Sequence, residues 1–243
     1  MNAMPRWNHL PTERREAWKV IGGLSEPSKM LGFGFGLPPL KTCPIGSHLN
    51  KIEGSSCYDC YALKGNYISY KCVATAQERR LSLLPESNDV FGLEWQQWID
   101  AMVHSIPSGK TLNAKYFRWH DAGDTHRAVY GEAIVEVAIR RPDTSYWVPT
   151  KETKLWASLR ILYGNRWPSN LSVRVSGAMI GARVFKGPQG LPTSLVHTDK
   201  VASGAYECPA YSQDGQCDGR KAGGFLCTAC FNPKVKAVSY PKH

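Results

Sequence analysis

The sequence predicts an α/β protein with parallel strands, either a partial open β/α barrel or a small parallel sheet, flanked by two loop-rich cysteine regions that bind metal. Strand-like segments alternate with amphipathic helical segments across residues 112–198, which is the pattern of βαβ units. Apolar residues make up 42% of the 243 residues, enough for a sizeable core. All eight cysteines lie outside the alternating region.

Each segment of the alternating region has its own signal. Their β-branched and aromatic residues predict strands at 112–119, 144–150, 171–177 and 195–198. Helices are expected at 126–141 and 154–163, and the first of these is expected to have Asp124 or Thr125 as its N-cap. Right-handed crossovers between the strands follow from this order.

The part of the chain before these units is predicted to be mostly helical. Helices are expected at 11–20, 73–84 and 91–106, the last because its apolar residues share one face. Residues 21–42 contain GFGFGLPPL and are expected to form an irregular loop, because glycine and proline interrupt regular structure.

We expect one domain over residues 1–243. It comprises an N-terminal helix and loop (1–42), a first cysteine quartet (43–72), helices and a βα core (73–200), and a second cysteine quartet (201–243). No run of about 18 apolar residues is present to span a membrane, and the N-terminus lacks the apolar segment of a secretory signal. The sequence therefore predicts a soluble intracellular protein that does not contact a membrane.

The cysteines form two quartets that predict metal binding. The first quartet is Cys43, Cys57, Cys60 and Cys72, and the second is Cys208, Cys217, Cys227 and Cys230. Each contains one C-x-x-C pair, a spacing that lets two sulfurs turn toward one ion or cluster. Disulfides are not expected in a reducing cytosol.

The spacing favours iron–sulfur clusters, with zinc as the alternative. Structural zinc sites usually pair two short knuckles, whereas the gaps here are 13, 2 and 11 residues and then 8, 9 and 2. One close pair with two outlying cysteines suits a [4Fe-4S] cluster, whose irons are spread out. A crossed arrangement, in which Cys57 and Cys60 join Cys227 and Cys230, also stays open.

Polar residues gather where three predicted strands end. In parallel α/β folds the sites lie at the carboxyl ends of strands, and a site is therefore expected here. The catalytic candidates are His120, Asp121, Asp124 and Lys151, and the substrate-binding candidates are Arg118, Thr150, Arg174 and Ser176.

Several motifs resemble those of a known family. They are CYDCYALKGNY (57–67), YFRWHDAGD (116–124), WVPTKE (147–152), VRVSG (173–177), CPAYSQDGQC (208–217) and CTACFNPKVKAVSYPKH (227–243). In this order they resemble the phage gene product 88 family. The resemblance implies a viral protein acting in the cytoplasm of a bacterial host.

A second, architectural resemblance is to radical S-adenosylmethionine enzymes, which combine a partial β/α barrel with iron–sulfur clusters. Their usual C-x3-C-x2-C motif leaves one iron open for the cofactor and is absent here. Two complete cysteine quartets would leave no open iron, so this chemistry is not expected.

The sequence thus predicts an iron–sulfur protein with two [4Fe-4S] clusters and a redox or electron-transfer role on an unidentified substrate or partner. The alternative is a binding module whose loops are held together by structural zinc and which binds nucleic acid or a host protein. The formal charge of +10 makes a polyanionic partner reasonable, although no run of five Lys or Arg occurs. The sequence leaves open whether the protein is an enzyme.

Overall fold

A seven-stranded, all-parallel sheet runs through the protein. The structure is a computed structural model, and it describes residues 12–27, 30–109, 111, 114–217 and 224–242. The strand order is β1-β2-β3-β4-β5-β7-β6, and every neighbouring pair is parallel. The strands are β1 (Phe33–Phe35), β2 (Tyr116–Trp119), β3 (Ser145–Thr150), β4 (Leu171–Ser176), β5 (Thr193–His197), β6 (Tyr206–Glu207) and β7 (Ala237–Pro241). The predicted α/β class with a parallel, open sheet is confirmed.

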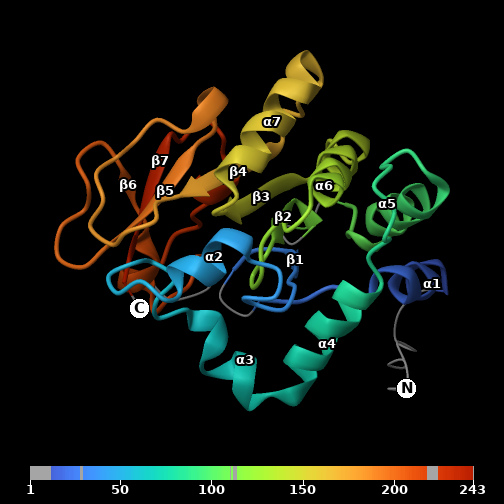
Figure 1. Cartoon of the computed structure of the whole chain (residues 1–243), viewed down its shortest axis with the longest axis horizontal. Coiled ribbons are helices and arrows are strands. Elements are labelled where there is room, and N and C mark those ends of the chain that lie inside the picture. The colour runs from blue at the N-terminus through green and yellow to red at the C-terminus, as the bar shows by residue number, and fades with distance from the viewer. Residues whose placement is uncertain (1–11, 28–29, 110, 112–113, 218–223, 243) are drawn as a thin grey trace.

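Three helices cover one face of this sheet (Figure 1). They are α5 (Leu93–Ser105), α6 (Ala128–Arg140) and α7 (Thr153–Tyr163); α5 also packs against α1 (Thr12–Ile21). Helix α6 forms because apolar residues recur at helical spacing, and its Val129, Ala133 and Val137 are buried against the sheet. This packing forms the main hydrophobic core.

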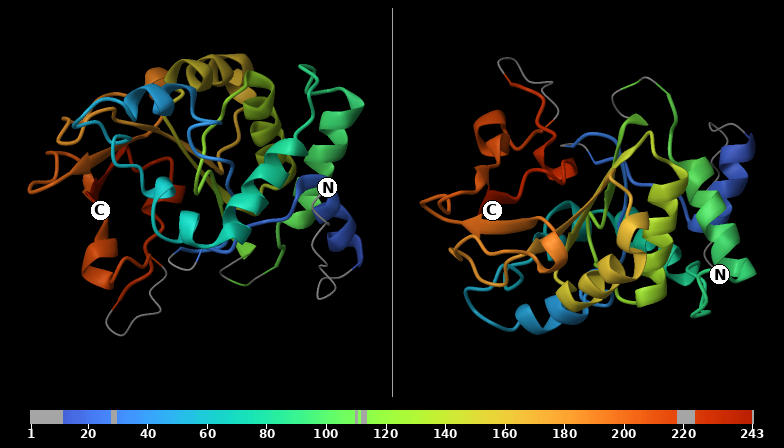
Figure 2. Two further views of the ribbon diagram at one scale, coloured as in Figure 1. Left: turned by 60° about the horizontal axis from the view of Figure 1, so that its bottom comes forward. Right: turned by 90° about the horizontal axis from the view of Figure 1, so that it is seen from above.

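Side chains alternate across the strands, so the opposite face has a different chemistry. Phe117 and Trp119 of β2 point into the main core, whereas Arg118 between them stacks over Trp147 of β3 on the opposite face, 4.5 Å from the ring centroid. Trp147 in turn contacts Phe231 and Tyr240 from the C-terminal segment. That segment therefore covers the face of the sheet that the helices leave open (Figure 2).

Three helices follow the edge strand β1 along the chain. They are α2 (Pro44–Leu49), α3 (Asn66–Ser69) and α4 (Lys71–Ser82). From α4, Arg79 donates hydrogen bonds to the carbonyl of Gly22, and Arg80 donates to those of Gly23 and Gly36. The two arginines thus tie this helix to the chain on either side of β1.

Two expectations from the sequence were wrong, and two strands were not predicted. The segment 21–42 is not wholly irregular, because Phe33–Phe35 forms β1 beside β2. A strand of three residues is too short to show the alternation of apolar and polar residues that predicts a strand. The C-terminal strands β6 and β7 had not been expected. Neither Asp124 nor Thr125 caps α6, whose N-cap is Arg127. The Asp124 carboxyl group instead accepts hydrogen bonds from Thr125, Thr150 and Lys151. Residue 11 of the expected helix 11–20 and residues 112 and 113 of the expected strand 112–119 lie outside the described residues.

Among the described residues, no helix has both the length and the apolar content that a membrane crossing requires.

Candidate metal centres

The four cysteines of the second quartet come together around β6 and β7. Cys208 follows β6, and Cys227 and Cys230 lie on the segment that leads into β7; Cys208 and Cys227 are buried in one small apolar cluster. The Cys208 and Cys217 thiols are hydrogen-bonded, which lowers the pKa of Cys208. The backbone N–H of Cys227 donates to the carbonyl of Cys217 at 2.9 Å.

Two tyrosines reach the same group of sulfurs. The hydroxyl of Tyr240 lies 3.1 Å from Sγ of Cys230, and that of Tyr206 lies 3.7 Å from Sγ of Cys227. The thiols of Cys208, Cys227 and Cys230 all raise the pKa of Cys217 together with its burial and hydrogen bond. All four thiols of this quartet therefore lie within electrostatic reach of one another.

Arg174 of β4 holds the loop that carries Cys230. Its guanidinium is fully buried and donates to five backbone carbonyls, those of Ala229, Cys230, Asn232, Val235 and Thr193, at 2.7 to 3.3 Å. We expected Arg174 to bind substrate at a strand end. The structure instead places it on the face that the C-terminal segment covers, with its donors directed at the protein's own backbone.

The first quartet is less compact. Gly46 of α2 lies under two of its thiols: a Cβ added there would stand 3.8 Å from Sγ of both Cys43 and Cys57. Cys60 is close enough to act electrostatically on both, and burial raises the pKa of Cys43 to about 12. Cys72 is exposed at the start of α4, whereas the other three thiols are half-buried.

The cysteines thus group within their own quartets, and this favours that arrangement over the crossed one. In the part of the chain that the structure describes, no group of three or more His, Cys, Asp or Glu side chains is arranged so that it could hold a metal ion.

Three of the predicted strand-end residues do meet beside the first group. One oxygen of the buried Asp124 accepts hydrogen bonds from the Thr150 hydroxyl and the Thr125 N–H, and the other accepts from the Lys151 N–H, each at 2.7 Å. Burial raises the pKa of Asp124 to about 7. The carboxyl group therefore fastens the end of β3 to the loop after β2.

Lys151 links that cluster to the first cysteines. Its Nζ donates to Oγ of Ser56 at 2.5 Å and to the carbonyl of Gly177, and its charge acts on Cys57. Lys151 also lines a hollow of about 410 Å³ at the ends of β3 and β4, together with Ser176. The hydroxyl of Ser176 lies 3.0 Å from that of Ser194.

The other three candidates are placed apart from this cluster. Arg118 donates to the Tyr61 hydroxyl at 3.1 Å. The backbone carbonyl of Asp121 accepts from the hydroxyls of Tyr61 and Tyr67, at 2.6 and 3.0 Å. His120 is buried 3.3 Å from the Tyr130 hydroxyl, and burial lowers its pKa to about 3, so its imidazole is neutral.

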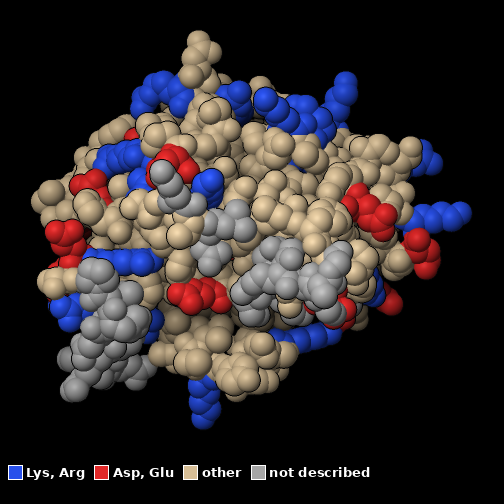
Figure 3. Space-filling view, turned by 180° about the vertical axis from the view of Figure 1, so that it is seen from behind, with Lys and Arg blue, Asp and Glu red and all other residues tan. Residues whose placement is uncertain are grey.

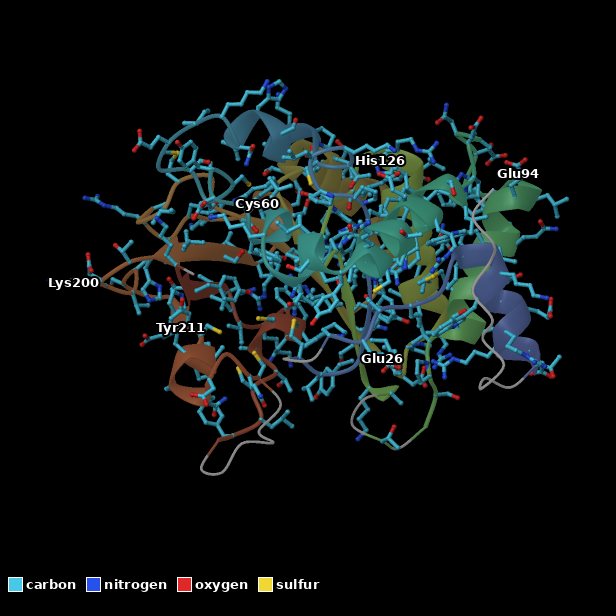
Figure 4. All side chains as sticks on the ribbon, turned by 90° about the horizontal axis from the view of Figure 1, so that it is seen from below. Glu26, Cys60, Glu94, His126, Lys200 and Tyr211 are labelled. Carbon is cyan, nitrogen blue, oxygen red and sulfur yellow. The ribbon has the colours of Figure 1, made fainter. Side chains whose placement is uncertain are left out.

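Sequence reasoning missed the aromatic side chains that link the two cysteine groups. Tyr61, the neighbour of Cys60, bonds to Arg118; Arg118 stacks on Trp147; and the ring of Trp147 lies 6.3 Å from that of Tyr240. Tyr240 touches Cys230. In the view of Figure 4, the segments that carry Cys60 and Tyr211 lie on the near side of the sheet. The available signal was the alternation along β2 and β3, which puts Arg118 and Trp147 on one face.

The charged side chains do not gather in one patch on the face of the molecule that Figure 3 shows. On the face shown in Figure 3, Lys and Arg side chains lie mainly around the rim, with Asp and Glu between them. The formal charge of +10 is therefore spread rather than gathered over this face.

Comparison with known proteins locates the chain in one family. No curated protein matches it, and no solved structure does either. The model of the family described as "Gene product 88" matches residues 10–201, a span that includes the first cysteine group and strands β1 to β5 and ends before Cys208. The chain belongs to the phage gene product 88 family.

Proposed function

We propose that this protein is an iron–sulfur protein that carries one cluster at each cysteine group and moves electrons between them. The observation that carries the proposal is the shared, largely buried site of Cys208, Cys217, Cys227 and Cys230. Four thiolates are the usual ligands of a [4Fe-4S] cluster. As a phage protein, it would act inside a bacterial host.

The arrangement of the thiols supports clusters over zinc. A zinc ion needs four ligand atoms around one point at about 2.3 Å, whereas a cluster spreads its irons and takes each thiolate at a different corner. The four thiols of the second group act on one another electrostatically. The gaps of 8 and 9 residues between Cys208, Cys217 and Cys227 suit thiolates that bind different corners of a cluster.

The surroundings supply the features that adjust a cluster. Hydrogen bonds to the sulfurs and nearby positive charge raise a cluster's reduction potential. At the second group, the Tyr240 hydroxyl lies at hydrogen-bonding distance from Cys230, and the Arg174 guanidinium holds the backbone on either side of that cysteine. At the first group, Lys151 supplies a positive charge near Cys57.

The contacts between the two groups support an electron-transfer role. Arg118, Trp147 and Tyr240 form a continuous packed path from Tyr61, next to Cys60, to Cys230. No step of that path exceeds 6.3 Å between the interacting atoms or ring centroids. These groups would carry an electron from one cluster to the other without a change in their own covalent structure.

Metal and sulfide analysis of protein purified without oxygen tests the proposal. We expect iron and acid-labile sulfide in equal amounts, with a broad visible absorption. Cys227→Ser is expected to lose the iron and sulfide of one site and to destabilise the fold, because metal binding is coupled to folding. Ser203→Ala, an exposed position in the same segment, is the control and keeps both. Zinc without sulfide would overturn the proposal and favour the zinc-stapled binding module.

A further inference from the structure

Lys151 is a half-buried cation that forms no ion pair within the described residues. Its Nζ donates hydrogen bonds to Oγ of Ser56 and to the carbonyl of Gly177, and both of these acceptors are uncharged. No described carboxylate oxygen lies within 4.0 Å of this nitrogen. A charge held away from water without a counter-charge costs free energy, so the ammonium group favours an anion beside it.

Two neighbouring carboxyl groups are engaged elsewhere. Asp124 acts electrostatically on Lys151, but its oxygens accept hydrogen bonds from the Thr150 hydroxyl and from the backbone N–H groups of Thr125 and Lys151. The carboxylate of Glu152, the next residue in the chain, accepts a hydrogen bond from the N–H of Ile45 at 2.8 Å. Neither carboxyl group therefore forms a direct ion pair with the Lys151 ammonium.

Lys151 lines an apolar hollow at the ends of β3 and β4. Its volume of about 410 Å³ falls within the range of small-molecule sites, about 300–1,000 Å³. Thr153 and Ser176 are its other polar lining residues, and the remaining ones are Ile45, Leu49, Val175, Gly177, Ala178, Met179, Ala182 and Phe185. Ile45, Met179 and Phe185 are exposed despite their size. Exposed apolar side chains gathered around one hollow are typical of a ligand site.

Hydrogen bonds within the chain fix the walls of this hollow. The N–H of Ser56 donates to the carbonyl of Ala178 at 2.8 Å, and the N–H of Ile180 donates to the carbonyl of Gly54 at 2.9 Å. Lys151 bonds to the same two loops, through Ser56 and Gly177. The hollow is therefore formed before any ligand binds.

We propose that this hollow binds a small molecule with an apolar body and one anionic group, which lies against the Lys151 ammonium. An ammonium group has three donors, and two of them are directed at Ser56 and Gly177, so the third meets the anion. The apolar body covers the exposed side chains of Ile45 and Met179. No cysteine lines the hollow, so the site goes beyond the proposed function and does not require a cluster.

Octanoate tests the chemical class of the ligand, because it joins an apolar chain to one carboxylate. The controls are 1-octanol, which has no charge, and acetate, which has almost no apolar body. In calorimetric titrations we expect octanoate to bind at least about tenfold more tightly than 1-octanol, the usual effect of one hydrogen bond to a charged group, and acetate not to bind. Equal affinities for octanoate and 1-octanol would overturn the anion assignment. No binding of octanoate at millimolar concentration would overturn the site itself.

Three variants locate the binding. Lys151→Met should lower the affinity for octanoate about tenfold and leave the affinity for 1-octanol unchanged. Lys154→Met removes an exposed lysine of α7 that does not line the hollow and, as the matched control, should keep both affinities. Ala182→Phe fills the hollow and should weaken both ligands, and it decides the matter if Lys151→Met does not fold. An unchanged affinity for octanoate in either hollow variant would refute the inference. Iron content of the same samples reports separately on the proposed function.

Discussion

Replacement of Arg174 by methionine tests whether this side chain is the link between the sheet and the second cysteine group. The guanidinium reaches four carbonyls of the segment 229–235 and the carbonyl of Thr193. Methionine has a similar length and an apolar body, so it fills part of the space but donates no hydrogen bonds. The variant therefore removes a donor from five carbonyls, of which those of Ala229 and Asn232 keep a backbone N–H partner.

The expected cost follows from two opposing effects. A hydrogen bond from a charged donor contributes about 1.5–3 kcal/mol, but burying the guanidinium costs several kcal/mol. Removing one member of a buried charged network typically costs about 3–5 kcal/mol, out of a total stability of about 5–15 kcal/mol. In a chain of this size that corresponds to a decrease in Tm of about 10 °C.

Thermal unfolding and iron analysis measure the two consequences. Arg174→Met should lower the Tm and also lose iron from the second group, because the loop that carries Cys230 is no longer held. Arg183→Met, at an exposed position, is the matched control and should change neither. If Arg174→Met stays within about 1 kcal/mol of the wild-type stability and retains its iron, the guanidinium does not hold the site.

Three further predictions follow from single positions. Burial raises the pKa of Asp124 from 3.8 to about 7, so the folded protein binds this proton more tightly than the unfolded chain does. The free energy of unfolding should therefore fall as pH rises between about 4 and 7, by at most about 1.4 kcal/mol per pH unit. Asp124→Asn should flatten that slope in denaturant titrations over the same pH range. Trp147→Leu should slow electron exchange between the reduced and oxidised clusters, seen by rapid-freeze paramagnetic resonance, with iron content unchanged; an unchanged rate would exclude this path. Gly123→Ala should lower the free energy of unfolding by about 2–4 kcal/mol, because Gly123 has φ +80° and an added Cβ would lie 2.5 Å from the Thr42 hydroxyl. Gly164→Ala, where φ is +47° and the space is open, should lower it by only about 1–2 kcal/mol. Equal losses of stability in the two variants would contradict the steric argument.

Periodicity made the central elements predictable. The helix expected at 126–141 is Ala128–Arg140, and the strand expected at 171–177 is Leu171–Ser176. These segments bury one face or both, so their apolar residues recur with the period of the element. The strand β1 has three residues with a central glycine and no period to detect. Its pairing with β2 depends on contacts far away in sequence.

The candidate site was predictable in part for the same reason. The rule that polar residues gather at strand ends brought Asp124, Thr150 and Lys151 together correctly. The rule does not distinguish the two faces of a strand. Arg174 lies between Val173 and Val175, which belong to the main core. The alternation of side chains along β4 therefore predicts that Arg174 lies on the face of the sheet opposite to that core. What covers that face is set by a segment more than fifty residues later, which local sequence does not reveal.

The sheet topology explains how cysteines so far apart in sequence come to lie over one face. The first group is inserted after β1 and the second after β6, and the carboxyl ends of parallel strands meet at one end of the sheet. Yet β1 and β6 are its two opposite edge strands, so a flat sheet would hold the two insertions far apart. Twist and curvature bring the edges around, and Arg118 and Tyr240 then come within electrostatic reach across that face. The charges of Asp59 and Lys242 also act on each other.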